Sequence, residues 1–363
     1  MRKDIATTTQ YNPDHDLNAT LAKVGASKTV YALVTPWTEA GKARVFGNTG
    51  SEERLAYLEQ FREAWTGKQD AYHREFFDVW CDWSKRVVDL DREAWPFSYP
   101  TAGASEPIRH LIYDLAARSL GKARVHIFTG EYEGYKAMAE AAGLELVEHD
   151  RDMDAIPENV ADLAVQMRDD DLFFISQPSA IDGNVWSSFN DFVDAMPEGS
   201  VVADITYVGA VPQDAIKERF DLNATSIRNV VFSLSKPFGC YYDRIGGVFA
   251  RQQDPGLFGN QWFKNLTSLR LGTDLMRHHG VFDIPKLMGD LQKAATSEIG
   301  RNLGMDLHPS HVILLATSRT REAGPMAQYL ERAGRTRLCL TSRLCQMLME
   351  SNRRSRWGAE RTE

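Results

Sequence analysis

The sequence lacks the features that mark several broad classes of protein. Its four cysteines, among 363 residues, are too scattered for a disulfide framework and show no CxxC spacing. No apolar run approaches the roughly 18 residues that a transmembrane helix needs. The first residues, MRKDIATTTQYNPDHD, contain no apolar core of a secretory signal. We therefore expect a cytoplasmic protein with reduced thiols and no membrane partner.

Basic charge is also scarce. The formal net charge is −8, and one basic cluster, Arg353–Arg356, stands close to the end of the sequence. A chain without a broad basic field is poorly suited to hold a polyanion, so nucleic acid is not an expected partner. Histidine pairs such as His308 and His311 lack further ligands at metal-like spacing, so no metal site is predicted. No GxSxG, Walker A or GxGxxG motif occurs.

Strands and helices alternate in the second quarter of the sequence and beyond. Short apolar runs at 125–129, 144–148, 171–176, 200–204 and 228–233 are separated by helical segments. This rhythm predicts an α/β fold, a three-layer α/β/α large domain with a mostly parallel sheet, plus a smaller α+β domain. We assign residues 1–95 to an N-terminal arm and the helical part of the small domain. The large domain is assigned to 96–285, and the small domain to 286–363.

An aromatic stripe marks the predicted helical segment 70–95. Phe76, Phe77, Trp80 and Trp83 recur there at helical spacing. Such a stripe indicates either core packing or a dimer interface. A second helical segment is predicted at 52–67.

A set of chemically reactive residues follows two of the predicted strands. Asp204 ends the run 200–204 and is followed by Tyr207, whereas Ser233 ends the run 228–233 and is followed by Ser235 and Lys236. Open α/β sheets bind ligands at the carboxyl ends of their strands. Arg244 stands eight residues beyond the lysine. A turn cap explains Asp204 alone, and a loop explains Lys236 alone. The ordered set supplies an amine, a carboxylate, a phenol, hydroxyls and a guanidinium, which are the groups that pyridoxal 5'-phosphate (PLP) needs.

This set resembles the fold-type I PLP-dependent enzymes, in particular the class I/II aminotransferases such as the histidinol-phosphate aminotransferase family. The resemblance runs from about Tyr99 to Gly247 and is weaker over 308–342. It implies an aspartate aminotransferase-like fold, an amino acid substrate and a homodimer whose active sites are shared. Lys236 would bind the cofactor covalently and move the Cα proton. Asp204 would pair with the ring nitrogen, and Tyr207 would donate to the ring oxygen.

The resemblance also assigns residues to the phosphate, the ring face and the substrate. A helix start would hold the phosphate with its backbone N–H groups, aided by hydroxyls and a bidentate guanidinium. An aromatic ring would stack on the pyridine. The phosphate residues are Gly103, Ala104, Ser105, Ser233, Ser235 and Arg244, and the stacking residue is Tyr132. Arg337, in the run Arg337-Leu-Cys-Leu-Thr341, is the expected anchor of the substrate carboxylate, with Arg319 as its rival.

One departure from the family concerns a loop that usually reads Asn-Pro-x-Gly. Here Ala180 stands at the Asn position, and Gln177, Ser179 and Asn184 are the candidates to replace its amide. The sequence therefore predicts an aminotransferase, with a PLP-dependent lyase, cyclase or oxidase as the alternative. A non-catalytic scaffold is the third reading.

Overall fold

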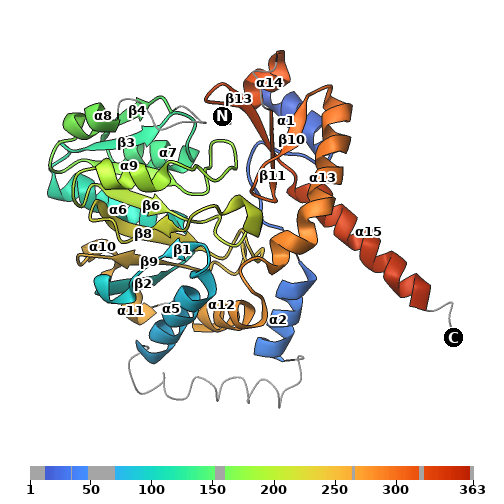
Figure 1. Cartoon of the computed structure of the whole chain (residues 1–363), viewed down its shortest axis with the longest axis horizontal. Helices are drawn as coiled ribbons and strands as arrows, with labels where there is room; N and C mark the ends of the chain where they lie inside the picture. The colour runs from blue at the N-terminus through green and yellow to red at the C-terminus, as the bar shows by residue number, and fades with distance from the viewer. Residues whose placement is uncertain are drawn as a thin grey trace, which may run out of the picture.

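The computed structural model describes residues 13–33, 35–47, 70–151, 160–263, 266–318 and 323–359. In this part of the chain, two larger sheets and their helices stand beside each other (Figure 1), and two short strands form a third sheet. No helix of the described residues is long and apolar enough to cross a bilayer. The predicted helix 52–67 lies outside these residues.

The larger sheet has seven strands, of which all but β9 run in the same direction. This confirms the predicted mostly parallel sheet. Strand β9 pairs antiparallel with both of its neighbours, β2 and β8. In sheet order the strands are β2 (Phe97–Thr101), β9 (Gly246–Ala250), β8 (Ile227–Ser233), β6 (Val201–Asp204), β5 (Leu172–Ser176), β3 (Arg124–Phe128) and β4 (Glu145–His149).

Helices cover both faces of this sheet because successive strand side chains point to opposite faces. In β6, Val202 packs with one apolar cluster, whereas Val201 and Ala203 pack with the other. The first cluster contains apolar residues of α6 and α7, and the second contains those of α5, α9 and α12. The helices around this sheet are α5 (Asp70–Ser84), α6 (Ser105–Arg118), α7 (Glu133–Ala141), α8 (Val160–Gln166), α9 (Phe189–Ala195), α10 (Pro255–Phe258), α11 (Asn260–Phe263) and α12 (Leu266–His278).

Helix α5 packs its aromatic stripe on the large sheet. The Trp80 ring stacks on Phe232 of β8 at 4.3 Å, and Phe77 meets Phe249 of β9 edge-on at 5.0 Å between ring centroids. Phe76, Phe77 and Trp80 are all buried within the chain. The stripe is therefore core, and its alternative use as a dimer interface was wrong. The helical segment from residue 70 also packs with the large domain, and not with the small one as we expected.

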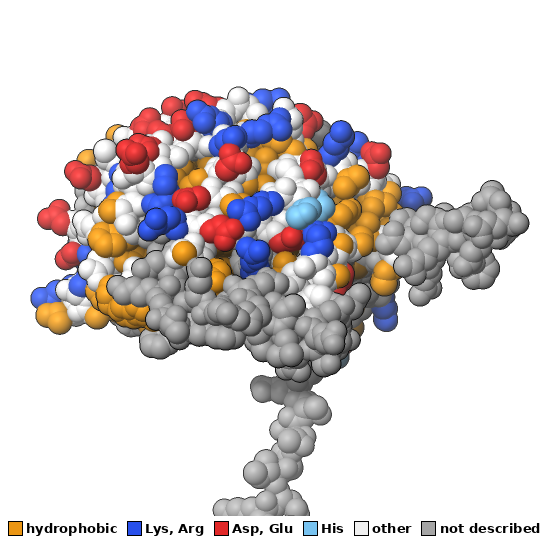
Figure 2. All heavy atoms as spheres, turned by 90° about the horizontal axis from the view of Figure 1, so that it is seen from below, with side chains coloured by type: hydrophobic (Ala, Val, Ile, Leu, Met, Phe, Trp, Pro, Cys, Tyr) orange, Lys and Arg blue, Asp and Glu red, His pale blue; other side chains and the backbone are white. Residues whose placement is uncertain are grey.

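Helices α2 (Pro36–Phe46), α5 and α12 form the lower side of the molecule in Figure 1. Figure 2 shows this side from below, with acidic and basic side chains interspersed over its described surface. Ion pairs join the helices there. Arg44 of α2 contacts Asp274 of α12 at 2.7 Å, and Arg277 of α12 contacts Glu75 of α5 at 2.8 Å.

The smaller sheet is antiparallel, in the order β10 (Leu307–Pro309), β11 (Leu315–Ser318), β13 (Arg335–Cys339) and β12 (Glu331–Arg332). Around it lie α1 (Pro13–Lys23), α13 (Asp283–Leu303), α14 (Pro325–Leu330) and α15 (Thr341–Ala359). Strand β11 begins at Leu315 and does not include the apolar residues 312–314 that precede it. The apolar residues 312–314 instead dock on loops of the large sheet, where Val312 N donates to Gly183 O and Ile313 N donates to Ala210 O.

Two short strands complete the described part. Strand β1 (Val88–Asp89) pairs in parallel with β7 (Phe220–Asp221). We still propose a large domain over about 96–285 and a small domain over 286–363. Helix α5, which precedes residue 96, is now assigned to the large domain as well.

Candidate active site

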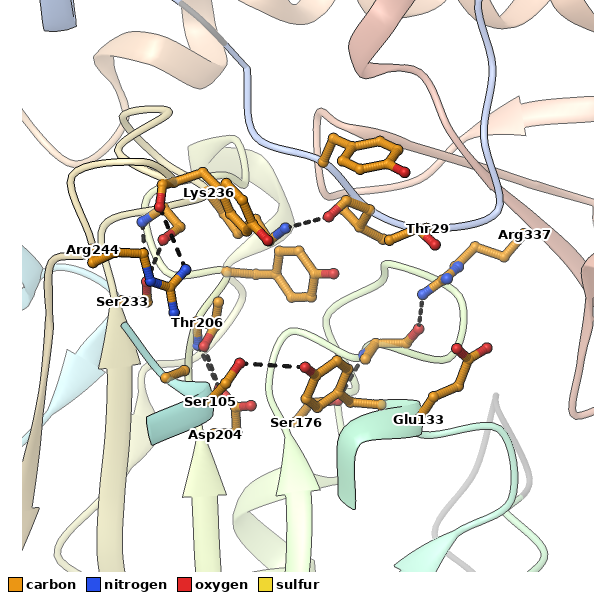
Figure 3. Close-up of a pocket in the computed structure, with 18 of the residues that line it drawn as sticks. Thr29, Ser105, Glu133, Ser176, Asp204, Thr206, Ser233, Lys236, Arg244 and Arg337 are labelled. Carbon is orange, nitrogen blue, oxygen red and sulfur yellow. Dashed lines mark hydrogen bonds between the residues drawn. The ribbon is translucent and has the colours of Figure 1, made fainter. Parts of the chain in front are cut away.

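A cavity of about 560 Å³ lies between the carboxyl edge of the large sheet and the small sheet (Figure 3). Its walls bring together residues from distant parts of the sequence. Of the predicted site residues, Ala104, Ser105, Tyr132, Asp204, Tyr207, Ser233, Ser235, Lys236, Arg244 and Arg337 line it. Gly103 does not line the cavity but lies against Arg244.

Asp204 ends strand β6 and is buried in the cavity wall. Thr206 donates to its Oδ1 from both the backbone N, at 3.0 Å, and the hydroxyl, at 2.5 Å. The Tyr135 hydroxyl donates to Oδ2 at 2.8 Å. Burial raises the pKa of Asp204, and these hydrogen bonds oppose the rise because they favour the carboxylate. The result is an oriented acceptor at the strand end.

Lys236 follows β8, and its amine donates to the Val30 carbonyl at 2.6 Å. Burial lowers the pKa of Lys236 to about 8 because the charged ammonium loses its hydration. A lysine with such a pKa is partly neutral at mildly alkaline pH, which is the form that attacks carbonyls and accepts protons.

Tyr207 lies on the same wall and is buried. Burial raises the pKa of Tyr207 to about 12, so its phenol keeps its proton and can donate a hydrogen bond.

Arg244 and Gly103 form one corner of the cavity. The Arg244 Nη2 donates to the Ala102 carbonyl at 2.6 Å. A Cβ added to Gly103 would lie 2.8 Å from the same nitrogen, and Gly103 has a φ of 76°. Both facts favour glycine at this position. Arg244 itself has a φ of 51°, an uncommon conformation for a residue with a side chain and one that concentrates at functional sites.

Hydroxyls and a helix start face the same corner. Ser233 Oγ donates to Ser235 Oγ at 2.9 Å, and both line the cavity. Helix α6 begins at Ser105, and the first N–H groups of a helix have no partner within the helix. Together with the Arg244 guanidinium, these groups form a donor set for a phosphate.

Tyr132 stands at the cavity wall, 38% exposed. Its hydroxyl lies 3.3 Å from Ser105 Oγ, and its ring meets Tyr135 edge-on at 5.4 Å. Because Tyr132 is partly exposed at the cavity wall, its aromatic ring can contact a flat ligand. Stacking of Tyr132 on the cofactor stays a prediction.

Arg337 projects into the cavity from β13 of the small sheet and is buried. Its Nη1 donates to the Ala180 carbonyl at 2.5 Å and its Nη2 to the Lys28 carbonyl at 3.2 Å. Its Nε is buried without a hydrogen bond, and no carboxylate pairs with it within the described ranges. A buried guanidinium in this state is suited to receive a carboxylate. Its rival Arg319 lies outside the described residues.

The loop at Ala180 provides no replacement for the family's amide from the three candidates. Gln177 bonds both backbone groups of Trp186, Ser179 bonds Arg151, and Asn184 bonds Asp182. None of the three lines the cavity, whereas Ala180 does.

Several contributors to the cavity were missed by the sequence reasoning. The N-terminal segment Thr29–Tyr31 also lines it, and Figure 3 shows Thr29 there. Arg332 of β12 bonds the carbonyls of Gly130 and Glu131 at 3.1 Å and pairs with Glu133 at 2.6 Å. No local sequence pattern predicts these contacts. Tyr135, in contrast, could have been predicted as a site residue, because it lies one helical turn beyond the candidate Tyr132.

Comparison with known proteins identifies a family. Residues 102–297, which are 196 of the 363 residues, match the model of the family described as aminotransferase class I and II. A search of curated proteins found no match.

Solved structures of similar fold are numerous. They include an aminotransferase from Eubacterium rectale, with 15% identity, a TM-score of 0.60 and coverage of 93% of each chain. A PLP-bound C-S lyase from Staphylococcus hominis has 10% identity and a TM-score of 0.63, covering 96% of this chain and 95% of that one. A double mutant of the Thermus thermophilus aspartate aminotransferase has 12% identity and a TM-score of 0.59, with coverage of 94% and 96%. At these identities the likeness shows the fold alone.

Proposed function

Since the chain belongs to the aminotransferase class I and II family of PLP-dependent enzymes, we propose that it transfers the amino group of an amino acid. The observation that carries this proposal is the convergence of Asp204, Lys236, Arg244 and Arg337 on one cavity. These residues come from both sheets, and each offers a different group to a cofactor or substrate.

PLP fits the residues present. Its phosphate matches the donor set of Ser233, Ser235, Arg244 and the start of α6. Its ring nitrogen matches the Asp204 carboxylate, whose other contacts are all hydrogen-bond donors. Its carbonyl matches the Lys236 amine, which burial holds partly neutral. When bound, PLP supplies an electron sink for charge that develops at the substrate Cα.

The chain's own residues then have separate tasks. Lys236 accepts the Cα proton and returns it, as a general base with a pKa near neutrality can. Asp204 holds a proton on the ring nitrogen. Tyr207 donates a hydrogen bond to the ring oxygen, because its raised pKa keeps the phenol protonated. Arg337 orients the substrate through its carboxylate.

A PLP-dependent lyase, cyclase or oxidase is the second candidate, favoured by the alanine at position 180. An amide there would contact the cofactor and substrate in most of the family, and Ala180 offers none. Incubation with amino acids plus pyruvate or 2-oxoglutarate separates the candidates. A new amino acid and a new keto acid support transfer, whereas release of ammonia or of a side-chain fragment supports the alternative.

A homodimer and a cytosolic location also belong to this proposal. Tyr241 and Tyr242 line the cavity beside Arg244 yet are 42% and 84% exposed, so a second copy would have apolar area to cover there. We expect a sedimentation mass of twice 40.9 kDa. A stable monomer with full activity would contradict the shared site.

Replacement of Arg337 by lysine should weaken amino acid binding although the positive charge is kept. The guanidinium can meet both carboxylate oxygens at once, and an ammonium cannot. Loss of one charge-assisted hydrogen bond costs about 1.5–3 kcal/mol, which corresponds to roughly a 10- to 150-fold rise in KM. Steady-state kinetics measures this change.

The matched variant is Arg319→Lys, which replaces the rival anchor. PLP occupancy should be normal in both variants, because the phosphate is held by other residues. If Arg319→Lys raises KM and Arg337→Lys does not, the anchor has been assigned to the wrong arginine.

A further inference from the structure

A buried carboxylate next to the cavity has no task in the mechanism above. Glu131 follows β3 and is 3% exposed. Both of its oxygens accept hydrogen bonds from one residue of the neighbouring strand. Oε1 accepts from the backbone N of Ser176 at 3.2 Å, and Oε2 accepts from the Ser176 hydroxyl at 2.6 Å. Glu131 therefore fixes the direction in which the Ser176 hydroxyl points.

Ser176 ends β5 and lines the cavity. Its hydroxyl donates to Glu131, so its lone pairs face away from the carboxylate. One of them accepts the backbone N–H of Ala180 at 2.6 Å. This contact closes the turn from 176 to 180 and sets the position of the Ala180 peptide.

The Ala180 carbonyl in turn accepts the Nη1 of Arg337 at 2.5 Å. Figure 3 shows Arg337 reaching across to this carbonyl. Besides this bond, the guanidinium donates to the Lys28 carbonyl at 3.2 Å, and its Nε has no hydrogen-bond partner among the residues that the structure describes. Because Ala180 has no polar side chain, it binds the arginine through its backbone carbonyl.

We propose that Ser176, oriented by Glu131, is a positioning residue for Arg337 and thereby for the substrate carboxylate. This proposal rests on the proposed function, in which Arg337 is the carboxylate anchor. The chain of contacts from Glu131 through Ser176 and Ala180 to Arg337 joins the large sheet to the small one. A guanidinium binds a carboxylate with both nitrogens only when its plane is held in one direction.

The experiment compares Ser176→Ala with Ser176→Thr, which keeps a hydroxyl. PLP-loaded protein is screened with the proteinogenic amino acids, and the one that changes the cofactor absorption most becomes the probe. We expect Ser176→Ala to raise the dissociation constant of this probe by roughly three- to tenfold, the value of one hydrogen bond. Ser176→Thr should restore most of the affinity. PLP occupancy, and kcat where turnover is detected, should stay close to wild type.

Ser179→Ala is the matched control. Ser179 is buried in the same loop, but its hydroxyl bonds Arg151 and the backbone N of Ile181, and does not bond Ser176, Ala180 or Arg337. Its substitution should leave probe affinity unchanged. If it weakens binding as much as Ser176→Ala, general loosening of the loop explains the effect and the proposal is overturned.

A double-mutant cycle tests the route through Arg337. In the Arg337→Lys background, Ser176→Ala should have little further effect, because the group that it positions is already gone. An undiminished effect would show that Ser176 acts without Arg337. If the wild type responds to the probe and Ser176→Ala binds the probe with equal affinity, the positioning role of Ser176 is contradicted, whereas the proposed function is not. If no amino acid changes the wild-type spectrum, the proposed function fails with it.

Discussion

Replacement of Lys236 by alanine should remove both the covalent attachment of PLP and turnover. The wild-type protein should be yellow, with a visible absorption band that borohydride abolishes by fixing the cofactor to the chain. The variant loses the amine that binds the cofactor and the base that moves the Cα proton. General base catalysis alone contributes about 10²–10⁴-fold, so the rate should fall by at least that factor. Peptide mapping after borohydride treatment should find the cofactor on the peptide that contains Lys236.

The same treatment of Lys286→Ala serves as the control. Lys286 is an exposed lysine of α13 that does not line the cavity. This variant should keep both the colour and the rate. Attachment of the cofactor to any lysine other than Lys236 would mean that the site has been assigned wrongly.

The large sheet and one wall of the cavity could be predicted because their signals are local. Asp204 and Lys236 each stand at the end of, or just after, a short apolar run, and parallel strands bring their carboxyl ends to one edge. The phosphate roles of Arg244 and of the start of α6 were instead implied by the resemblance to the family. The structure lines one cavity with residues of all these segments. Short apolar runs were thus sufficient to predict the positions of reactive residues that lie at strand ends.

The contacts that orient these groups could not be predicted. Tyr135 donates a hydrogen bond to Asp204, which lies 69 positions later in the sequence. Lys236 donates to the carbonyl of Val30, which lies 206 positions earlier. Such pairs are set by tertiary packing, and no periodicity encodes them. For the same reason the aromatic stripe of α5 indicated a buried face without indicating which sheet it covers. The Glu131–Ser176 contact joins neighbouring strand ends and shows no sequence motif.

Replacement of Asp204 by asparagine should cost far more in rate than in cofactor occupancy. The carboxylate holds the proton on the ring nitrogen, and a neutral amide does so poorly. Loss of one such preorganised electrostatic contact costs about 10²–10³-fold in kcat. PLP should still bind, because Ser233, Ser235 and Arg244 hold its phosphate independently. Absorbance gives the occupancy, and single-turnover kinetics gives the rate.

Tyr135→Phe provides a graded version of this experiment. It leaves the Asp204 carboxylate in place but removes the hydrogen bond that Tyr135 donates at 2.8 Å. Burial already raises the pKa of Asp204, and this bond opposes the rise, so its loss should raise the pKa further. The carboxylate would then be protonated at a higher pH, and the acid limb of the pH–rate profile should move upward. Near wild-type turnover in Asp204→Asn, or an acid limb unmoved in Tyr135→Phe, would contradict the role assigned to this carboxylate.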